Sequence, residues 1–292
     1  MQSSVLTNDK LTGYYTNAID ALCEIARAYY MDGKLSNAQH VLRTALQLTE
    51  SGEVAPRDRL KLLLLYGQVL IVDHLLAHGD ADLLFSTIQQ AKQIAEASQD
   101  QQSIADAFSL LGQAHYFTAV VANLRAGTLF NSHQGDGKYD EALAYQQQAL
   151  KLREALHDNR GISESYFQIG TVYERWGQYD RAQEHYTKAR QIADQYDYPF
   201  EKTEPTRHFA LHALMQGNLD QALTLALQAL ELREKAGFKP YQPLDHLLIR
   251  DVYQARGDTA NAQLHEQRAS AIAEEMGMPN LVSSVPSIKG EQ

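Results

Sequence analysis

The sequence contains a single cysteine, Cys23, among 292 residues. One thiol cannot form an internal disulfide, which favours a reducing compartment. The first ten residues, MQSSVLTNDK, lack a basic stretch followed by an apolar run, so we expect no signal peptide. The longest apolar stretch, 62–72, is too short to span a bilayer. We therefore expect a cytoplasmic protein with no membrane partner.

Basic residues are also scarce. There are 26 Lys and Arg against 36 Asp and Glu, the formal net charge is -10, and no run of Lys or Arg occurs. An acidic surface repels phosphate backbones, so we expect no nucleic-acid partner. Only 17 glycines and 7 prolines are present, which permits long helices, and the 44% of hydrophobic residues suits a sizeable core.

Six glycines mark a repeated unit. An alanine follows each glycine by twelve residues, and in five units another follows by five residues. Residues seven apart lie on one face of a helix, where alanine lets a second helix approach closely. The glycines are Gly33, Gly79, Gly137, Gly177, Gly217 and Gly257, and the alanines are Ala45, Ala91, Ala149, Ala189, Ala229 and Ala269.

Each repeated glycine is expected to end the first helix of a hairpin, because glycine tolerates a positive φ. Three residues later, five of the six units have a side chain whose oxygen can cap the next helix. These predicted caps are Ser36, Asp82, Asp140, Asp180 and Asp220.

The best copy, 163–194, contains Tyr166, Gly170, Gly177, Ala182 and Ala189. It resembles the tetratricopeptide repeat (TPR) signature at nearly every position. The repeated glycines are 46, 58, 40, 40 and 40 residues apart, against roughly 34 in a standard TPR. The longer spacing is similar to that of TPR units in bacterial signalling proteins. The resemblance covers about residues 15–277 and implies an all-α, right-handed α-solenoid of about six helix pairs.

We expect a single solenoid over residues 12–277, followed by a flexible tail over 278–292. The tail has two prolines, several serines and no helical pattern. The expected units are about 19–52, 60–98, 105–157, 163–197, 203–237 and 243–277.

The first helices of units 2 and 3 are expected to be longer than the others. Gly67 and Gly112 take the position of Gly170 at the helix contact, but the next repeated glycine follows 5 and 18 residues later than in the fourth unit. The longer insertion, 113–136, is half apolar and should be buried against a neighbour, with a helix break near Gly127. A polar loop, 131–137, should follow the break.

In a TPR array the concave groove is lined by first helices at fixed offsets, and the resemblance transfers these offsets to ten residues here. It implies that the groove binds a peptide or helix of a protein partner, so that the protein is a scaffold or adaptor rather than an enzyme. The groove residues are Tyr30, Lys61, Leu64, Gln68, Gln113, Tyr116, Phe117, Phe167, Arg207 and His208.

A sensor or enzyme with a small ligand under the unit 3 insertion is an alternative. His74/His78 and His208/His212 have the i,i+4 spacing that can chelate a transition metal. Further ligands would have to come from His115, Asp73 or Glu174. We favour packing or surface histidines, and predict no metal or cofactor.

A second alternative is a homodimer formed through the apolar helices of units 2 and 3. No catalytic residue is predicted, because Cys23 has no histidine beside it in the sequence to act as a base.

Overall fold

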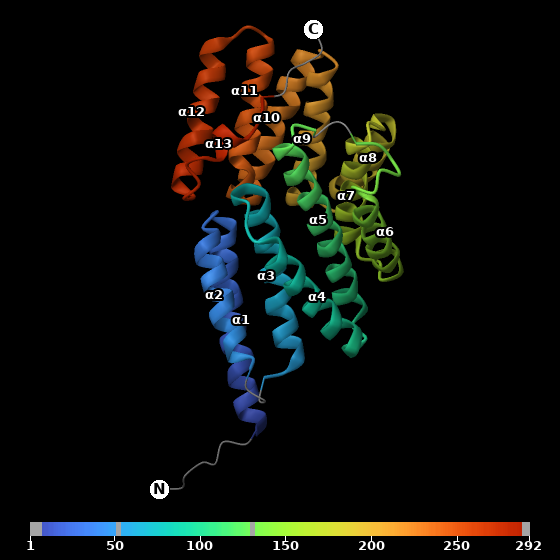
Figure 1. Ribbon diagram of the computed structural model, residues 1–292, viewed down its shortest axis with the longest axis vertical. Helices are drawn as coiled ribbons and strands as arrows, with labels where there is room; N and C mark the ends of the chain where they lie inside the picture. Colours follow the sequence, from blue (N-terminus) through green and yellow to red (C-terminus); the bar gives the residue numbers. More distant parts are fainter. Residues whose placement is uncertain (1–7, 51–53, 129–131, 288–292) are drawn as a thin grey trace.

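The computed structural model describes residues 8–50, 54–128 and 132–287. All regular structure in these ranges is helical, and the helices pair in chain order into a curved stack (Figure 1). The expected all-α solenoid of TPR-like pairs is confirmed. The pairs are α1 (Asn8–Met31) with α2 (Leu35–Leu48), α3 (Pro56–Ala77) with α4 (Ala81–Ser98), α5 (Gln101–Arg125) with α6 (Asp140–Ala155), α7 (Asn159–Arg175) with α8 (Tyr179–Gln195), α9 (Pro199–Met215) with α10 (Leu219–Ala236), and α11 (Gln242–Ala255) with α12 (Thr259–Glu275).

Five of the six repeated glycines have φ between +68° and +78°, as the turn between paired helices requires. Gly79 is the exception, because His78 takes the left-handed conformation at the end of α3, with φ 56°. A Cβ on Gly79 would instead lie 2.0 Å from Asp73 Oδ2. In unit 2 the glycine therefore serves a close approach rather than a positive φ.

The predicted helix caps are wrong by one or more residues. Asp80, not Asp82, caps α4, and its Oδ1 accepts hydrogen bonds from the backbone N–H groups of Asp82 and Leu83 at 2.9 and 3.1 Å. Asp180 and Asp220 lie in the first turns of α8 and α10. Carboxylates there favour the helix through its macrodipole rather than as caps.

Glycines at the helix contacts allow unusually close packing. A Cβ on Gly67 would lie 3.0 Å from Ile88 Cγ1, and one on Gly112 would lie 2.7 Å from Gln146 Nε2. On Gly170 it would lie 2.6 Å from Tyr186 Cε1. These contacts set how closely the first and second helices of units 2 to 4 pack.

The lengthened helices α3 and α5 have 22 and 25 residues, more than the first helices of units 4 to 6, which have 14 to 17. Helix α1, with 24 residues, is as long, which the glycine spacing did not predict. By length and composition α3 could cross a membrane, contrary to the sequence-based expectation, but 67% of its most apolar window is buried inside the protein. Apolar side chains such as Leu62 and Val69 are fully buried and unavailable to a dimer partner. In α5 the insertion continues the helix as far as Arg125, and two of its apolar residues, Val120 and Val121, are buried. Gly127, just after the helix, has φ +67°. The break near Gly127 is confirmed; the expected polar loop lies partly outside the described residues.

Residues after 277 differ from the flexible tail expected. A short helix, α13 (Leu281–Ser284), follows α12, and Leu281 is 4% exposed because it packs into the largest hydrophobic cluster. Residues 288–292 lie outside the described residues.

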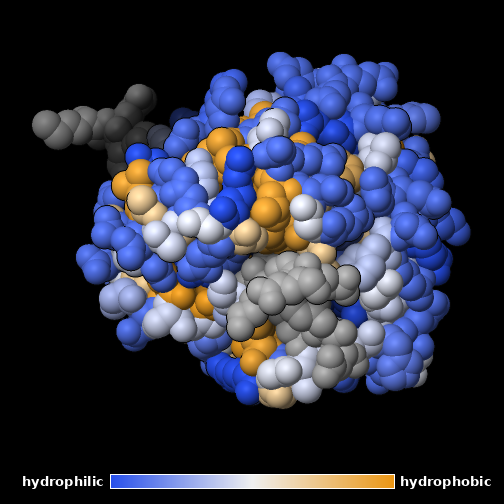
Figure 2. Space-filling view, turned by 90° about the horizontal axis from the view of Figure 1, so that it is seen from above, coloured by the Kyte–Doolittle hydropathy of each residue, from blue (hydrophilic) through white to orange (hydrophobic). Residues whose placement is uncertain are grey.

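The solenoid curves until its first unit touches its last. Met276, just after α12, packs on Gly33 in the turn between α1 and α2, as the adjoining helix ends in Figure 1 illustrate. A 3-10 helix, η1 (Lys239–Tyr241), lies at the same junction and contacts α1. From above, the surface is mostly hydrophilic, and hydrophobic residues are recessed near its centre (Figure 2).

Candidate functional site

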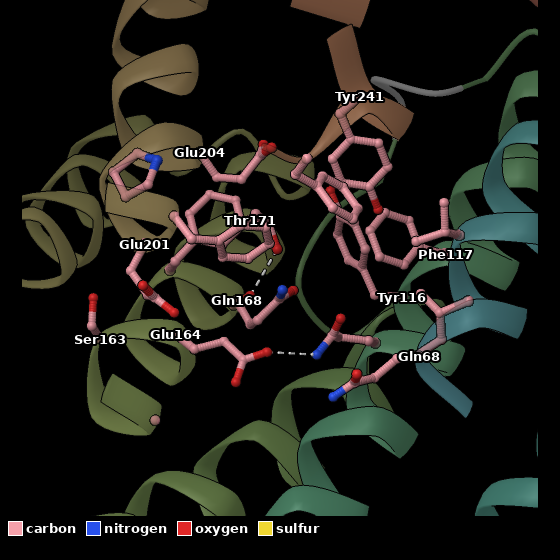
Figure 3. A pocket seen from close by; sticks show the side chains of 18 of the residues that line it. Gln68, Tyr116, Phe117, Ser163, Glu164, Gln168, Thr171, Glu201, Glu204 and Tyr241 are labelled. Carbon is pink, nitrogen blue, oxygen red and sulfur yellow. Dashed lines mark hydrogen bonds between the residues drawn. The ribbon is translucent and has the colours of Figure 1, made fainter. Parts of the chain in front are cut away.

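The concave side of the stack holds a partly open cavity of about 830 Å³. Its walls come mainly from the first helices α1, α3, α5, α7, α9 and α11, with Arg153 of α6 and the segment around η1. Figure 3 shows several of the lining side chains. Helices that are distant in the sequence thus contribute side chains to the same space.

Eight of the ten predicted groove residues line this cavity. Lys61 and Leu64 do not. Lys61 lies seven residues before Gln68, about two helical turns along α3, and pairs with Asp20 of α1. Leu64 is half-buried against hydrophobic clusters. The eight residues are Tyr30, Gln68, Gln113, Tyr116, Phe117, Phe167, Arg207 and His208.

One wall is aromatic. Phe238 packs edge-on against Tyr30, Tyr241 and Phe200, with ring centroids 5.3, 5.2 and 5.3 Å apart. Phe117 of α5 packs against Tyr116 at 5.1 Å. Such a wall can hold an apolar or aromatic side chain of a ligand.

The opposite wall is charged. Arg153 of α6 is buried, and its Nη2 lies 2.8 Å from Glu164 Oε2 and 3.2 Å from Asp106 Oδ1. Burial raises the pKa of Asp106, although Arg153 opposes that rise. The Arg153 Nη1 group also donates hydrogen bonds to Gly161 O and Ser165 Oγ. Arg153 is therefore the fixed cation that holds this wall in place.

Glu201 of α9 belongs to the same wall. Its Oε1 accepts a hydrogen bond of 2.5 Å from Arg160 Nε. Its Oε2 is buried and has no hydrogen-bond partner among the described residues. Glu201, Glu164 and Ser163 lie on one side of the cavity in Figure 3. Glu201 thus brings an acceptor oxygen without a partner among the described residues to the cavity lining.

Glu174, at the end of α7, is buried behind the cavity wall and contacts His208, which lines the cavity. Its Oε2 lies 2.8 Å from both His208 Nδ1 and His212 Nε2, and accepts a hydrogen bond of 3.0 Å from Tyr186 Oη. Burial alone would raise the pKa of Glu174, but His208, His212 and Arg175 outweigh burial and hold it well below its usual range.

The histidine pairs do not form a metal site with other side chains. No group of three or more His, Cys, Asp or Glu within the described residues could hold a metal ion. The Tyr186 hydroxyl fills the space beside the second pair, 3.2 Å from His208 Nδ1. In the first pair, His74 Nδ1 lies at hydrogen-bond distance, 2.7 Å, from Gly79 O. His78 lies just beyond the end of α3, in the left-handed conformation.

A short polar ladder crosses the cavity. Gln68, Gln113 and Thr171 each follow the contact glycine of their own helix, and they stand on α3, α5 and α7. These helices lie side by side, as their mutual contacts show. Gln113 Nε2 donates a hydrogen bond of 3.0 Å to Glu164 Oε1, drawn as the dashed line at Glu164 in Figure 3.

Several cavity residues were not predicted from the sequence, among them Asp106 and Arg153 of the charged wall. Glu164, Glu201 and Glu204 lie about one or two turns before predicted groove residues of their helices, so extending the groove offset along α7 and α9 would have found them. Phe238 and Tyr241 lie between units 5 and 6, and no sequence signal assigned them to the cavity. They reach it because the solenoid closes on itself.

Comparisons with known proteins agree with the fold. A family model described as tetratricopeptide repeat matches residues 125–195. No curated protein matches the sequence.

Solved structures of Rap proteins share the fold. A Rap protein complexed with competence and sporulation factor has a TM-score of 0.66 at 17% identity, covering 90% of this chain and 66% of its own. The Rap conjugation gene regulator of plasmid pLS20, in complex with the Phr* peptide, has a TM-score of 0.64 at 18% identity, covering 91% and 65%. Apo RapI has a TM-score of 0.62 at 13% identity, covering 89% and 84%. This chain thus spans about two thirds of the length of the first two structures, and at such identities the likeness shows the fold alone.

Proposed function

Because the chain is a tetratricopeptide-type helical-repeat protein whose first helices line a cavity, we propose that it binds a short peptide, or an extended end of a partner protein, inside that cavity. In this proposal the protein is a cytoplasmic adaptor or signalling component rather than an enzyme. The cytoplasmic location rests on the single cysteine.

The polar ladder is the observation that carries the proposal. Neighbouring packed helices are roughly 8–10 Å apart, and three residues of an extended peptide span about 10 Å. Side chains on successive helices can therefore meet a peptide backbone at regular intervals. The amides of Gln68 and Gln113 both donate and accept hydrogen bonds, and so suit the alternating groups of that backbone.

The cavity walls add side-chain selectivity. The aromatic wall around Phe238 suits an apolar group, while Glu201 Oε2 can accept a hydrogen bond from a donor group. A volume of about 830 Å³ limits the occupant to a short segment. The Rap structures support the same ligand class, since one of those proteins is bound to a peptide.

A random-sequence hexapeptide pool tests the proposal. The protein is immobilised and incubated with the pool, and retained peptides are sequenced by mass spectrometry and remade to measure Kd. Gln113→Ala should weaken binding of retained peptides about 3- to 10-fold, the effect of one lost hydrogen bond. Lys61→Ala is the matched control, because Lys61 lies outside the cavity, and it should bind like the parent.

Two results would reject the peptide proposal. Retention of no hexapeptide, with a small molecule seen by native mass spectrometry, would favour a small-ligand sensor. Peptide binding that survives Gln113→Ala and Phe117→Ala unchanged would place the peptide outside the cavity. Light scattering on the same samples tests the homodimer alternative, since a monomer has a mass of 32.8 kDa.

A further inference from the structure

We propose that residues outside the cavity, at the junction between the first and last units, build its aromatic wall and thereby set its affinity for ligand. We call this junction the clasp. It consists of Gly33 and Met276, with Lys239 between Asp32 and Glu275. The inference rests on the proposed function where it concerns affinity, but the clasp itself can be tested without a ligand.

Gly33 differs from the other turn glycines. A Cβ on Gly33 would lie 2.6 Å from Met276 Cγ. A Cβ on Gly177, Gly217 or Gly257 would meet no atom of the described residues within 4 Å. Position 33 therefore requires glycine for two reasons: its φ is +77°, and the Met276 side chain packs directly on its Cα. This turn is an interface between the first and last units, whereas those three turns face open space.

Charge completes the clasp. Lys239 Nζ lies 2.5 Å from Glu275 Oε1 of α12 and 3.6 Å from Asp32 Oδ1, just after α1. The Lys239 side chain is 20% exposed, so the cation is partly screened from water. One residue of η1 thus bridges the two ends of the solenoid.

The clasp is joined to the aromatic wall through the backbone. Tyr30 stands three residues before Gly33, and Phe238 directly precedes Lys239. Their rings meet edge-on at 5.3 Å, and both line the cavity. The same hydrophobic cluster contains residues of α1, Phe238 and Met276. Tyr30 is the member of the aromatic wall that the first unit supplies, so separation of the two ends would take Tyr30 away from Phe238 and open the wall on that side. Gly33, Met276 and Lys239 are therefore positioning residues that act through Tyr30 and Phe238.

The single cysteine makes the clasp measurable. In a Cys23→Ala background, Asn37→Cys on α2 and Ala271→Cys on α12 place spin labels at exposed positions on either side of the clasp. Pulsed electron resonance should give one narrow distance distribution. Met276→Ala should add a population at longer distance, and backbone hydrogen exchange at 27–34 and 238–242 should speed up at least fivefold.

Three controls separate the clasp from general stability. Met276→Leu keeps the volume of the side chain and should restore the narrow distribution. Met215→Ala removes a half-buried methionine at the end of α9, in a different hydrophobic cluster, and should leave distance and exchange unchanged. The fluorescence of the buried Trp176, in a third cluster, reports whether each variant remains folded.

The retained hexapeptides give the second readout. Binding should weaken at least fivefold in Met276→Ala, recover in Met276→Leu and remain unchanged in Met215→Ala. A folded Met276→Ala protein with the parent's distance distribution and exchange rates would overturn the clasp. Full peptide affinity despite a widened distance would overturn its role in the binding site. If the parent binds no hexapeptide, the proposed function fails, whereas distance and exchange still decide whether the clasp builds the wall.

Discussion

Arg233 of α10 donates two hydrogen bonds to the carboxylate of Asp245 on α11, from Nε at 2.5 Å and from Nη2 at 3.2 Å. Both side chains are 1% exposed. The guanidinium also donates from Nη2 to Glu204 Oε1, at 2.5 Å, and Glu204 lines the cavity. Although burial would raise the pKa of Glu204, Arg233 holds it below its usual value. One buried cation thus fixes two carboxylates, one of them in the binding site.

Arg233→Leu should therefore lower the free energy of unfolding by about 3 kcal/mol, because it breaks the buried pair with Asp245. Arg207, whose Nε lies 3.5 Å from Asp245 Oδ1, remains as a second cation and keeps the loss at this lower end. Urea denaturation followed by circular dichroism measures the change. Arg57→Leu is the matched control, since the Arg57 side chain is 79% exposed and its nearest carboxylate atom, on Asp58, lies 3.9 Å away. It should change stability by less than about 1 kcal/mol. Equal urea midpoints for Arg233→Leu and Arg57→Leu would contradict a stabilising role for the buried Arg233 ion pairs.

Gly170→Ala should destabilise the protein by about 1–3 kcal/mol, the usual result of overpacking. The new Cβ would lie 2.6 Å from Tyr186 Cε1 and 3.2 Å from the backbone oxygen of Ala182, so the Tyr186 ring and α8 must both move. Thermal unfolding measures the loss.

Gly13→Ala should have the opposite effect on stability to Gly170→Ala, because the new side chain has free space. Position 13 lies in α1, and a Cβ there would meet no described atom within 4 Å. Alanine should stabilise this helix by about 0.5–1 kcal/mol. Both variants replace a helical glycine with alanine, so they differ only in what surrounds the new Cβ. If both raise or both lower the free energy of unfolding, the contact with Tyr186 does not determine the effect of Gly170→Ala.

The repeat was readable from the sequence because its determinants act within one hairpin. Gly177 sets the φ of its own turn, and Ala182 and Ala189 pack inside the same unit. Gly79 shows the limit of this reasoning. Its position in the register is regular, but the lengthened α3 shifts the left-handed residue to His78. Position 79 is still glycine, but it permits the close approach of Asp73 rather than a positive φ.

The cavity was only partly predictable for the same reason. Groove offsets along a single helix found Gln113 and Phe167, whose positions depend on local periodicity. They could not exclude Lys61, because its place depends on how α3 lies against α1. The contact between Tyr30 and Phe238 joins residues far apart in the chain, and it follows from the accumulated curvature of all six units. No single repeat contains that information.

Acid should destabilise the protein through His246. His246 Nδ1 lies 3.0 Å from His265 Nδ1, and both side chains are buried. Burial, and then the neighbouring His265, lower the pKa of His246 from 6.5 to about 4. The unfolded chain therefore takes up this proton first as the pH falls. The contribution of His246 is complete above about pH 6.5 and is lost as the pH falls toward 4, which amounts to at most about 3 kcal/mol.

Urea unfolding at several pH values between 7 and 4 measures this loss. His246→Gln removes the titrating group, so its stability should fall less steeply over that range than the parent's. His40→Gln is the control, because His40 is exposed on α2, and it should keep the parent's slope. If His246→Gln loses stability as steeply as the parent, other groups cause the acid sensitivity and the buried histidine pair does not.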